Sequence, residues 1–107
     1  MQQLSPQALR AWLDDAARPA PTLVDVRERW EVEICAIPQA VSIPMQTIPS
    51  RASELDRDAE IVVICHHGGR SLQVGLFLER QNYSKVFNLS GGVDAWAKTV
   101  DPSMTTY

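Results

Sequence analysis

The sequence lacks the features typical of membrane-spanning, secreted and nucleic-acid-binding proteins. No segment of its 107 residues approaches the roughly 20 apolar residues that span a bilayer. The first residues, MQQLSPQALRAWLDD, lack the basic start and apolar stretch of a signal peptide. The 10 Lys and Arg residues against 13 Asp and Glu residues give a net charge of -3, which offers no electrostatic footprint for nucleic acid or an anionic membrane. We therefore expect a cytoplasmic protein with neither of these partners.

Cysteine is also scarce, since only Cys35 and Cys65 are present. With 45% hydrophobic residues the chain can form a core without cross-links, so a disulfide scaffold is neither indicated nor needed. No internal repeat or low-complexity linker divides the sequence. Length and composition thus predict a single domain over residues 1–107.

Strands and helices are expected to alternate along the chain. Ser5 and Pro6 are typical of a helix start, and Leu9 and Trp12 follow at helical spacing. The run AEIVVI, residues 59–64, predicts a central strand covered on both faces. Strands are also expected at 22–26, 40–43 and within 85–92, and helices or helical turns at 28–33, 45–56, 71–83 and 92–100. This alternation predicts an α/β fold with a mostly parallel sheet, whose ligands bind beyond the carboxyl ends of the strands.

The stretch IVVICHHGGRS, residues 61–71, places Cys65 where the central strand ends and a loop leads into a helix near Ser71. Gly68 and Gly69 allow positive φ angles, so that backbone N–H groups can point inward next to the positive end of the helix dipole. Such a cavity attracts an anion and favours the thiolate, which is the nucleophilic form of cysteine. Arg70 adds a permanent cation, and no carboxylate lies between Glu60 and Glu79 in the sequence.

Each of these residues also has a structural interpretation. Cys65 can be a small apolar residue that closes a strand, although a core cysteine does not require two glycines and an arginine beside it. His66 and His67 can be exposed loop residues without a specific role. A metal site is not expected, because adjacent histidines and one cysteine lack the paired spacing of a zinc site.

Three motifs together resemble single-domain rhodaneses. CHHGGRS, residues 65–71, is similar to the active-site loop of that family, with arginine five residues after the cysteine and then a serine that starts a helix. LVDVRERWEVEICAIPQAVSIP, residues 23–44, resembles the amino-terminal motif, and LSGGVDAW, residues 89–96, resembles the carboxy-terminal motif. The resemblance spans most of the chain in the right order.

The resemblance implies a five-stranded parallel sheet between helices and a catalytic Cys65 that carries sulfur as a persulfide. The donor would be a small anion such as thiosulfate, and the acceptor cyanide or a thiol, with no cofactor and no metal. Backbone N–H groups of residues 66–71 would hold the developing anion, which makes His66, His67, Gly68, Gly69, Arg70 and Ser71 the substrate-binding set. Arg70 would orient the donor.

Other residues are assigned supporting roles. Asp25 and Arg27 are interpreted as a strand-end ion pair that braces the loop, in preference to a direct catalytic role. Ser71 is interpreted as the cap or first turn of its helix. Two tryptophans, Trp30 and Trp96, are candidates for the pocket rim or the core, and Gly91 and Gly92 are expected to form a tight turn near the site.

The sequence departs from the family pattern at Cys35, Ala36 and Gln39, where glycine, histidine and glycine are common. This departure puts the local backbone shape in doubt. Cys35 also suggests a resolving thiol that forms a disulfide with Cys65, although core filling is the simpler interpretation.

Two alternatives compete with the sulfurtransferase hypothesis. Cysteine phosphatases and arsenate reductases attack tetrahedral anions from a similar loop, but place one more residue between cysteine and arginine than the four found here. The loop also has no acid to protonate a leaving alcohol. The second alternative is a binding module without catalytic activity, or a persulfide carrier that docks with one protein acceptor of sulfur.

Overall fold

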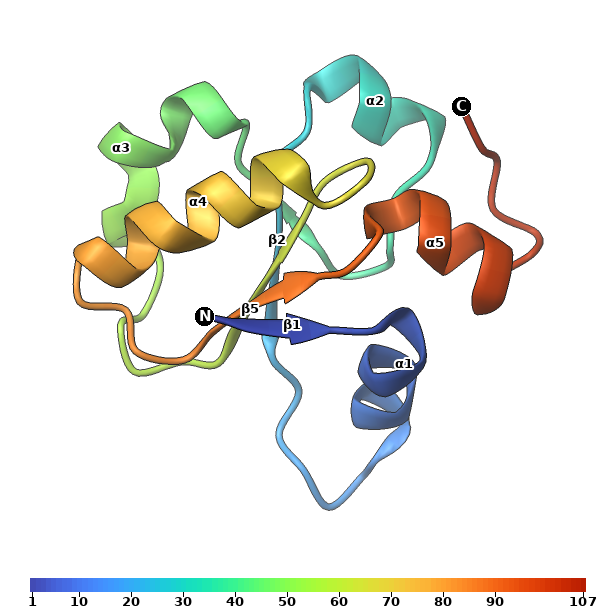
Figure 1. Ribbon diagram of the computed structural model, residues 1–107, viewed down its shortest axis with the longest axis horizontal. Coiled ribbons are helices and arrows are strands. Elements are labelled where there is room, and N and C mark those ends of the chain that lie inside the picture. The colour runs from blue at the N-terminus through green and yellow to red at the C-terminus, as the bar shows by residue number, and fades with distance from the viewer.

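The structure, a computed structural model, describes residues 1–107 and contains one five-stranded sheet surrounded by helices (Figure 1). In chain order the elements are β1 (Gln2–Leu4), α1 (Pro6–Asp14), β2 (Thr22–Asp25), α2 (Arg29–Ile34), β3 (Val41–Ser42), the 3₁₀ turn η1 (Met45–Thr47), α3 (Ile48–Arg51), the 3₁₀ turn η2 (Ala52–Glu54), β4 (Ile61–Ile64), α4 (Gly69–Arg80), β5 (Val86–Leu89) and α5 (Gly92–Thr99). The predicted α/β fold is confirmed.

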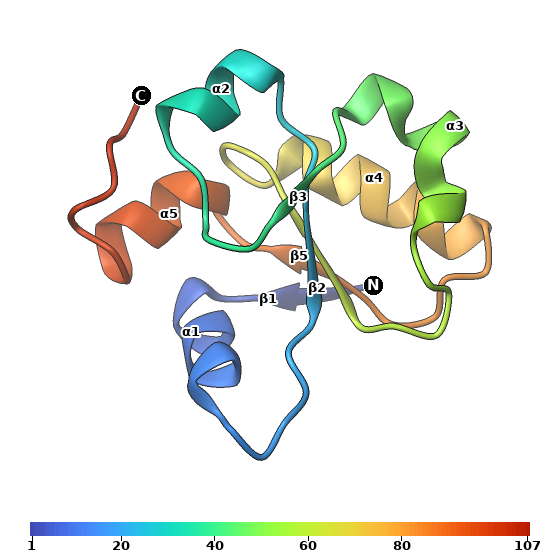
Figure 2. The ribbon, with the colours of Figure 1, turned by 180° about the vertical axis from the view of Figure 1, so that it is seen from behind.

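The strand order is β1-β5-β4-β2-β3, and every neighbouring pair is parallel. The edge strands are β1, visible in Figure 1, and β3, visible from behind in Figure 2. The central strand is β4, so its carboxyl end, where Cys65 follows, lies in the middle of the sheet. The expected five-stranded parallel sheet is therefore present.

The two faces of the sheet carry separate apolar cores. Alternate side chains of β4 serve both, since Ile61 and Val63 face one core while Val62 and Ile64 face the other. The first core includes Val74 and Leu78 of α4 and Ile48 of α3, and the second includes Leu9 and Trp12 of α1 and Val93 and Trp96 of α5. This two-sided burial explains why the strand is almost continuously β-branched.

Some boundaries differ from the predictions. The strand β1 was not expected, because Gln2 and Gln3 are polar and exposed. The helix α4 begins at Gly69 rather than near Ser71, and β3 is only two residues long. Gln39, where the family commonly has glycine, adopts φ +72°, a left-handed conformation that a residue with a Cβ adopts only at a cost.

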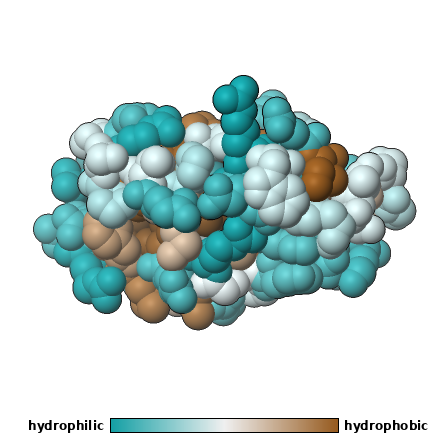
Figure 3. All heavy atoms as spheres, turned by 90° about the horizontal axis from the view of Figure 1, so that it is seen from above, coloured by the Kyte–Doolittle hydropathy of each residue, from teal (hydrophilic) through white to brown (hydrophobic).

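Hydrophilic and apolar side chains occupy different parts of the outer surface. In the view from above in Figure 3, hydrophilic side chains are prominent, whereas apolar side chains gather over α3 and α4. Leu72 and Leu76 of α4 are among the partly exposed apolar residues. None of the helices has both the length and the apolar character that a bilayer crossing requires.

A buried ion pair joins the end of β2 to α2. The Arg27 guanidinium and the Asp25 carboxylate, both almost fully buried, meet at 2.7 Å. Arg27 also donates to the Cys35 carbonyl at 2.7 Å, at the end of α2, and at 3.3 Å to the Glu31 carbonyl, which accepts from the Cys35 N–H as well. Arg27 therefore contacts both the end of β2, through Asp25, and the end of α2, through the Cys35 carbonyl. These contacts fix α2 against the sheet.

We expect Arg27→Met to lower the free energy of unfolding by about 3–5 kcal/mol, because it leaves the Asp25 carboxylate buried without its counter-charge. Urea unfolding at neutral pH measures this loss. The matched control is Arg29→Met, since Arg29 is 91% exposed and lies 3.9 Å from Glu33. A loss no larger than that of Arg29→Met would contradict the assigned role of Arg27.

Candidate active site

Cys65 lies between β4 and α4 with its side chain turned into the loop that follows. Its Sγ accepts a hydrogen bond from the Gly68 N–H at 3.0 Å and lies 3.3 Å from Ser71 Oγ. The residue is 1% exposed. Because the first turn of α4 begins at Gly69, the sulfur also lies near the positive end of that helix.

The loop can point an amide at the sulfur because Gly68 adopts φ +104°. A Cβ on Gly68 would stand 3.3 Å from the Gly91 backbone nitrogen, closer than ordinary contact. Gly69, by contrast, is the first residue of α4, has no positive φ and has open space around it. Of the two predicted glycines, only Gly68 therefore requires the absence of a side chain.

The start of α5 binds the carbonyl side of the same loop. The Val93 N–H donates to the Cys65 carbonyl at 2.9 Å, and the Asp94 N–H donates to the His66 carbonyl at 3.1 Å. Gly92, at φ +60°, has no room for a Cβ, which would fall far inside van der Waals contact with both of these carbonyls. The turn expected at Gly91 and Gly92 thus packs directly against the cysteine loop.

Ser71 lies in the first turn of α4, fully buried, and Gly68 rather than Ser71 is the N-cap. Its hydroxyl donates to Asn88 Oδ1. The Asn88 amide in turn donates to Gln3 Oε1 at 3.0 Å and to the Gly68 carbonyl at 3.2 Å, which orients its oxygen toward Ser71. Asn88 of β5 therefore holds the hydroxyl that touches Cys65.

The sequence around Arg70 offers no carboxylate to pair with it, but in the structure the Arg70 guanidinium forms an ion pair. Its Nη1 and Nη2 donate to the two carboxylate oxygens of Glu31, at 2.7 and 2.8 Å. These hydrogen bonds lower the pKa of Glu31 to about 2, against the opposing effect of burial, and they raise the pKa of Arg70. Residues 61–78 contain no carboxylate, and Glu31 of α2 provides the counter-charge to Arg70 instead.

Tyr107 covers one side of the site. Its hydroxyl donates to Glu31 Oε1 at 3.0 Å and accepts from Arg27 Nη1 at 2.9 Å. Its ring stacks on His66, with centroids 3.9 Å apart and planes 8° apart, and meets the exposed Trp30 edge-on at 6.1 Å. Burial raises the pKa of Tyr107 to about 12, so the phenol remains protonated.

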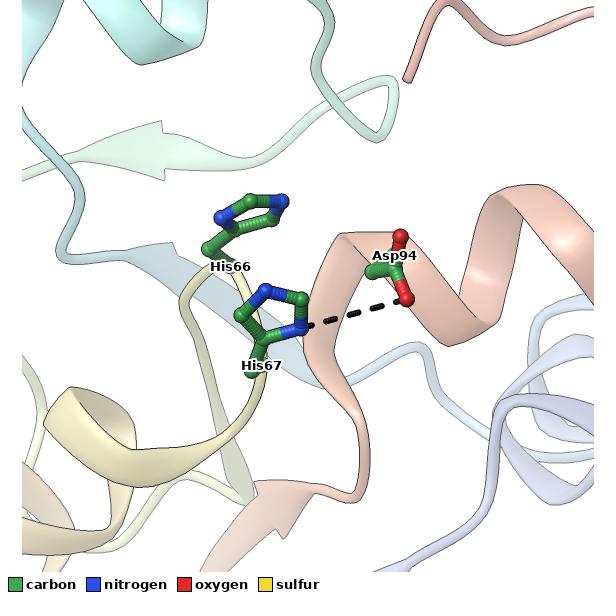
Figure 4. Close-up of side chains that lie close together, drawn as sticks. All are labelled: His66, His67 and Asp94. Carbon is green, nitrogen blue, oxygen red and sulfur yellow. Dashed lines mark ion pairs between the residues drawn. The ribbon is translucent and has the colours of Figure 1, made fainter. Parts of the chain in front are cut away.

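The two histidines and Asp94 of α5 lie together, with ligand atoms within 4.8 Å of one another (Figure 4). No third ligand stands near the histidines in the sequence, since Asp94 is distant along the chain. However, the His66 and His67 rings stack, with centroids 3.9 Å apart and planes 29° apart, so their in-plane lone pairs do not converge on one ion. Burial, followed by the neighbouring His67, lowers the pKa of His66.

Cys35 and Cys65 are both free thiols. Cys35 caps the end of α2, receives a long contact of 3.8 Å from Arg27 Nη1, and lines a narrow cleft with His66 and Tyr107. Trp96 is buried in the core, whereas Trp30 is 59% exposed next to Tyr107. Of the two tryptophans, only Trp30 therefore lies at the rim.

The arrangement suits a nucleophilic sulfur that works on an anion, because the Gly68 N–H donates to Sγ and the N-terminus of α4 lies beside it. Three residues of this network were absent from the set predicted from sequence: Glu31, Asn88 and Tyr107. Glu31 had a local signal only for a helix start, because Glu28 and Glu31 form a capping box at the start of α2, and none for a place in the site. Asn88 and Tyr107 had none, since their contacts to the loop join distant segments.

Comparison with known proteins places these features in a family. Residues 5–99 match the rhodanese-like domain. A sulfurtransferase from Allochromatium vinosum is 43% identical over 76 residues, 71% of each chain. The thiosulfate sulfurtransferase GlpE of Haemophilus influenzae is 31% identical over 105 residues, which cover 98% of this chain and 96% of GlpE.

The solved structures agree. A rhodanese-like domain protein from Staphylococcus aureus superposes with a TM-score of 0.85 at 28% identity, over 100% of this chain and 99% of that protein. The family match, the relatives and the superposition together cover the sheet, the cysteine loop and the start of α5. This chain belongs to the rhodanese-like domain family.

Proposed function

We propose that this protein is a sulfurtransferase that moves a sulfane sulfur from a small anionic donor, such as thiosulfate, to a thiol or cyanide through a persulfide on Cys65. The carrying observation is the position of Cys65 Sγ at the start of α4, 3.0 Å from the Gly68 N–H. Relatives named sulfurtransferases, at 31% and 43% identity, support activity of this type.

The first half of the cycle loads the enzyme. The Cys65 thiolate attacks the outer sulfur of thiosulfate, the sulfur–sulfur bond of the donor breaks, and sulfite leaves with the bonding electron pair. In the second half the acceptor thiolate or cyanide attacks the outer sulfur of the persulfide, and the Cys65 thiolate is released. Each half is a displacement at sulfur, so the kinetics are of the ping-pong type.

The loop provides the stabilisation that these displacements need. Cys65 carries negative charge before loading, as a thiolate, and after it, as a persulfide anion. Backbone N–H donors within residues 66–71 can stabilise this charge because they are fixed in place before the reaction. The carbonyls of Cys65 and His66 are bound by the amides of Val93 and Asp94, which leaves the amide side of the loop for the anion. Arg70 contributes the N–H groups that Glu31 does not use.

The alternatives receive less support. Four residues separate Cys65 from Arg70, one fewer than in cysteine phosphatases and arsenate reductases, and the Arg70 side chain is already paired. A binding module without catalytic activity would not need a sulfur placed against an amide. A persulfide carrier with one protein acceptor uses the same loading step and differs only in its acceptor.

We expect reduced wild-type protein, incubated with thiosulfate without an acceptor, to gain about 32 Da, the mass of one sulfur atom on Cys65. Intact-mass spectrometry measures the gain. Cys65→Ser should show no gain, while the matched control Cys35→Ser should load as wild type does. Loading that survives in Cys65→Ser, or its absence from the wild type with every sulfane donor tried, would contradict the proposed function.

We expect Gly92→Ala to slow persulfide formation by on the order of tenfold or more, because the new methyl group displaces the carbonyls of Cys65 and His66 and so misplaces the loop. The rate of mass gain with thiosulfate measures the effect, and circular dichroism verifies the fold. A folded variant that loads at the wild-type rate would show that the contact between α5 and the loop is not needed for the chemistry.

A further inference from the structure

Glu31 controls the charge next to the cysteine loop. Its side chain is 4% exposed and accepts hydrogen bonds from Arg70, from the Tyr107 hydroxyl and from the Glu28 N–H. With its pKa lowered to about 2, the carboxylate is ionised throughout the neutral range. The Arg70 guanidinium, 36% exposed, therefore carries a fixed counter-charge at 2.7 Å.

The other charged side chains near the loop are paired too. Arg27 meets Asp25 at 2.7 Å, and the Asp94 carboxylate meets both Lys98, at 2.9 Å, and His67, at 3.8 Å. Burial and the neighbouring His67 lower the pKa of His66, which disfavours its charged form. The positive field that remains at Cys65 is that of the backbone amides and the start of α4, equivalent to about half an elementary charge.

We propose that Glu31 sets the charge of the sulfur donor, so that the site prefers a donor with a single negative charge, such as a thiosulfonate or a persulfide anion, over a dianion. This inference rests on the proposed function, because it concerns the donor that loads Cys65. The second charge of a dianion loses water on binding and meets no unpaired cation in return. Glu31 acts through Arg70 and is a positioning residue.

Methanethiosulfonate and thiosulfate are a matched pair of probes. A methyl group in the first stands where the second has an oxygen, so the two are close in shape and differ by one charge. In both cases the Cys65 thiolate attacks the outer sulfur and the donor's sulfur–sulfur bond breaks. The electron pair leaves with methanesulfinate or with sulfite, and the Cys65 persulfide is formed without a further reactant.

The test measures the rate of persulfide formation against donor concentration for both probes. We expect Glu31→Gln to shift the preference toward thiosulfate by on the order of tenfold, because it releases the charge of Arg70. The change should be in the concentration for half-maximal loading rather than in the maximal rate, and it should shrink as the salt concentration rises. The matched control is Glu33→Gln, an exposed position on the same helix with the same charge change, which should leave the preference unchanged.

A second variant tests the same inference if Glu31→Gln does not fold. Arg70→Gln leaves the Glu31 charge unbalanced, so the preference should move the other way, away from thiosulfate, by a similar factor. The double variant Glu31→Gln with Arg70→Gln is neutral again, and its preference should return to that of the wild type. A merely structural role for either residue would not give opposite shifts that cancel.

The two failures are distinguishable. A wild-type protein in which neither probe loads Cys65 would overturn the proposed function and this inference with it. A wild-type protein that loads normally, with folded variants at both positions that keep the wild-type preference within about twofold, would overturn the role of Glu31 alone.

Discussion

The site depends on one constraint at the turn from β4 to α4: the loop can turn the Gly68 amide toward the sulfur of Cys65 only if the carbonyls of the same loop are bound elsewhere. Buried carbonyls without partners are costly, so the loop needs donors on its outer side. The N–H groups of Val93 and Asp94 meet this need, and the absence of a side chain at Gly92 lets α5 come close enough. The last helix is therefore part of the site although it does not touch the sulfur.

A second dependence runs from the core to the rim of the site. The buried pair of Asp25 and Arg27 holds the end of α2, and α2 carries Glu31, which fixes the guanidinium of Arg70. Tyr107 joins the two ends of this series, because its hydroxyl contacts both Arg27 and Glu31. The position and the charge of the rim thus follow from an ion pair at the end of β2, in the interior of the protein.

Sequence patterns predicted the parts of the fold that arise from local preferences. The apolar run of β4, the glycine at the turn and the helix after it each carry their own signal, and so the place of Cys65 at a strand end followed directly. The strand β1 had no such signal: Gln2 and Gln3 pair with β5 through their backbone, and their exposed side chains show no apolar alternation. Glu31 and Tyr107 were missed as site residues for a related reason, since only the folded chain brings them to the loop.

The absence of carboxylates around Cys65 in the sequence indicated a cationic rim, and the pairing of Arg70 with Glu31 replaces it with a neutral one. The neutral pair of Arg70 and Glu31 affects both steps of the proposed cycle, in which sulfur passes from the donor to Cys65 and then to the acceptor. On the proposed cycle each half binds one anion and must release another, and any unpaired cation would stabilise both the anion that arrives and the anion that leaves. Tight binding of that kind lowers the concentration of donor needed but does not lower the barrier between the bound states. On the proposed cycle the loop acts differently, because the Gly68 N–H already donates to Cys65 Sγ and stabilises charge at the sulfur where the displacement takes place. On the proposed cycle, the pairing of Arg70 with Glu31 leaves the stabilisation of the transferred sulfur to the loop, and the rim would distinguish one anion from another by its charge.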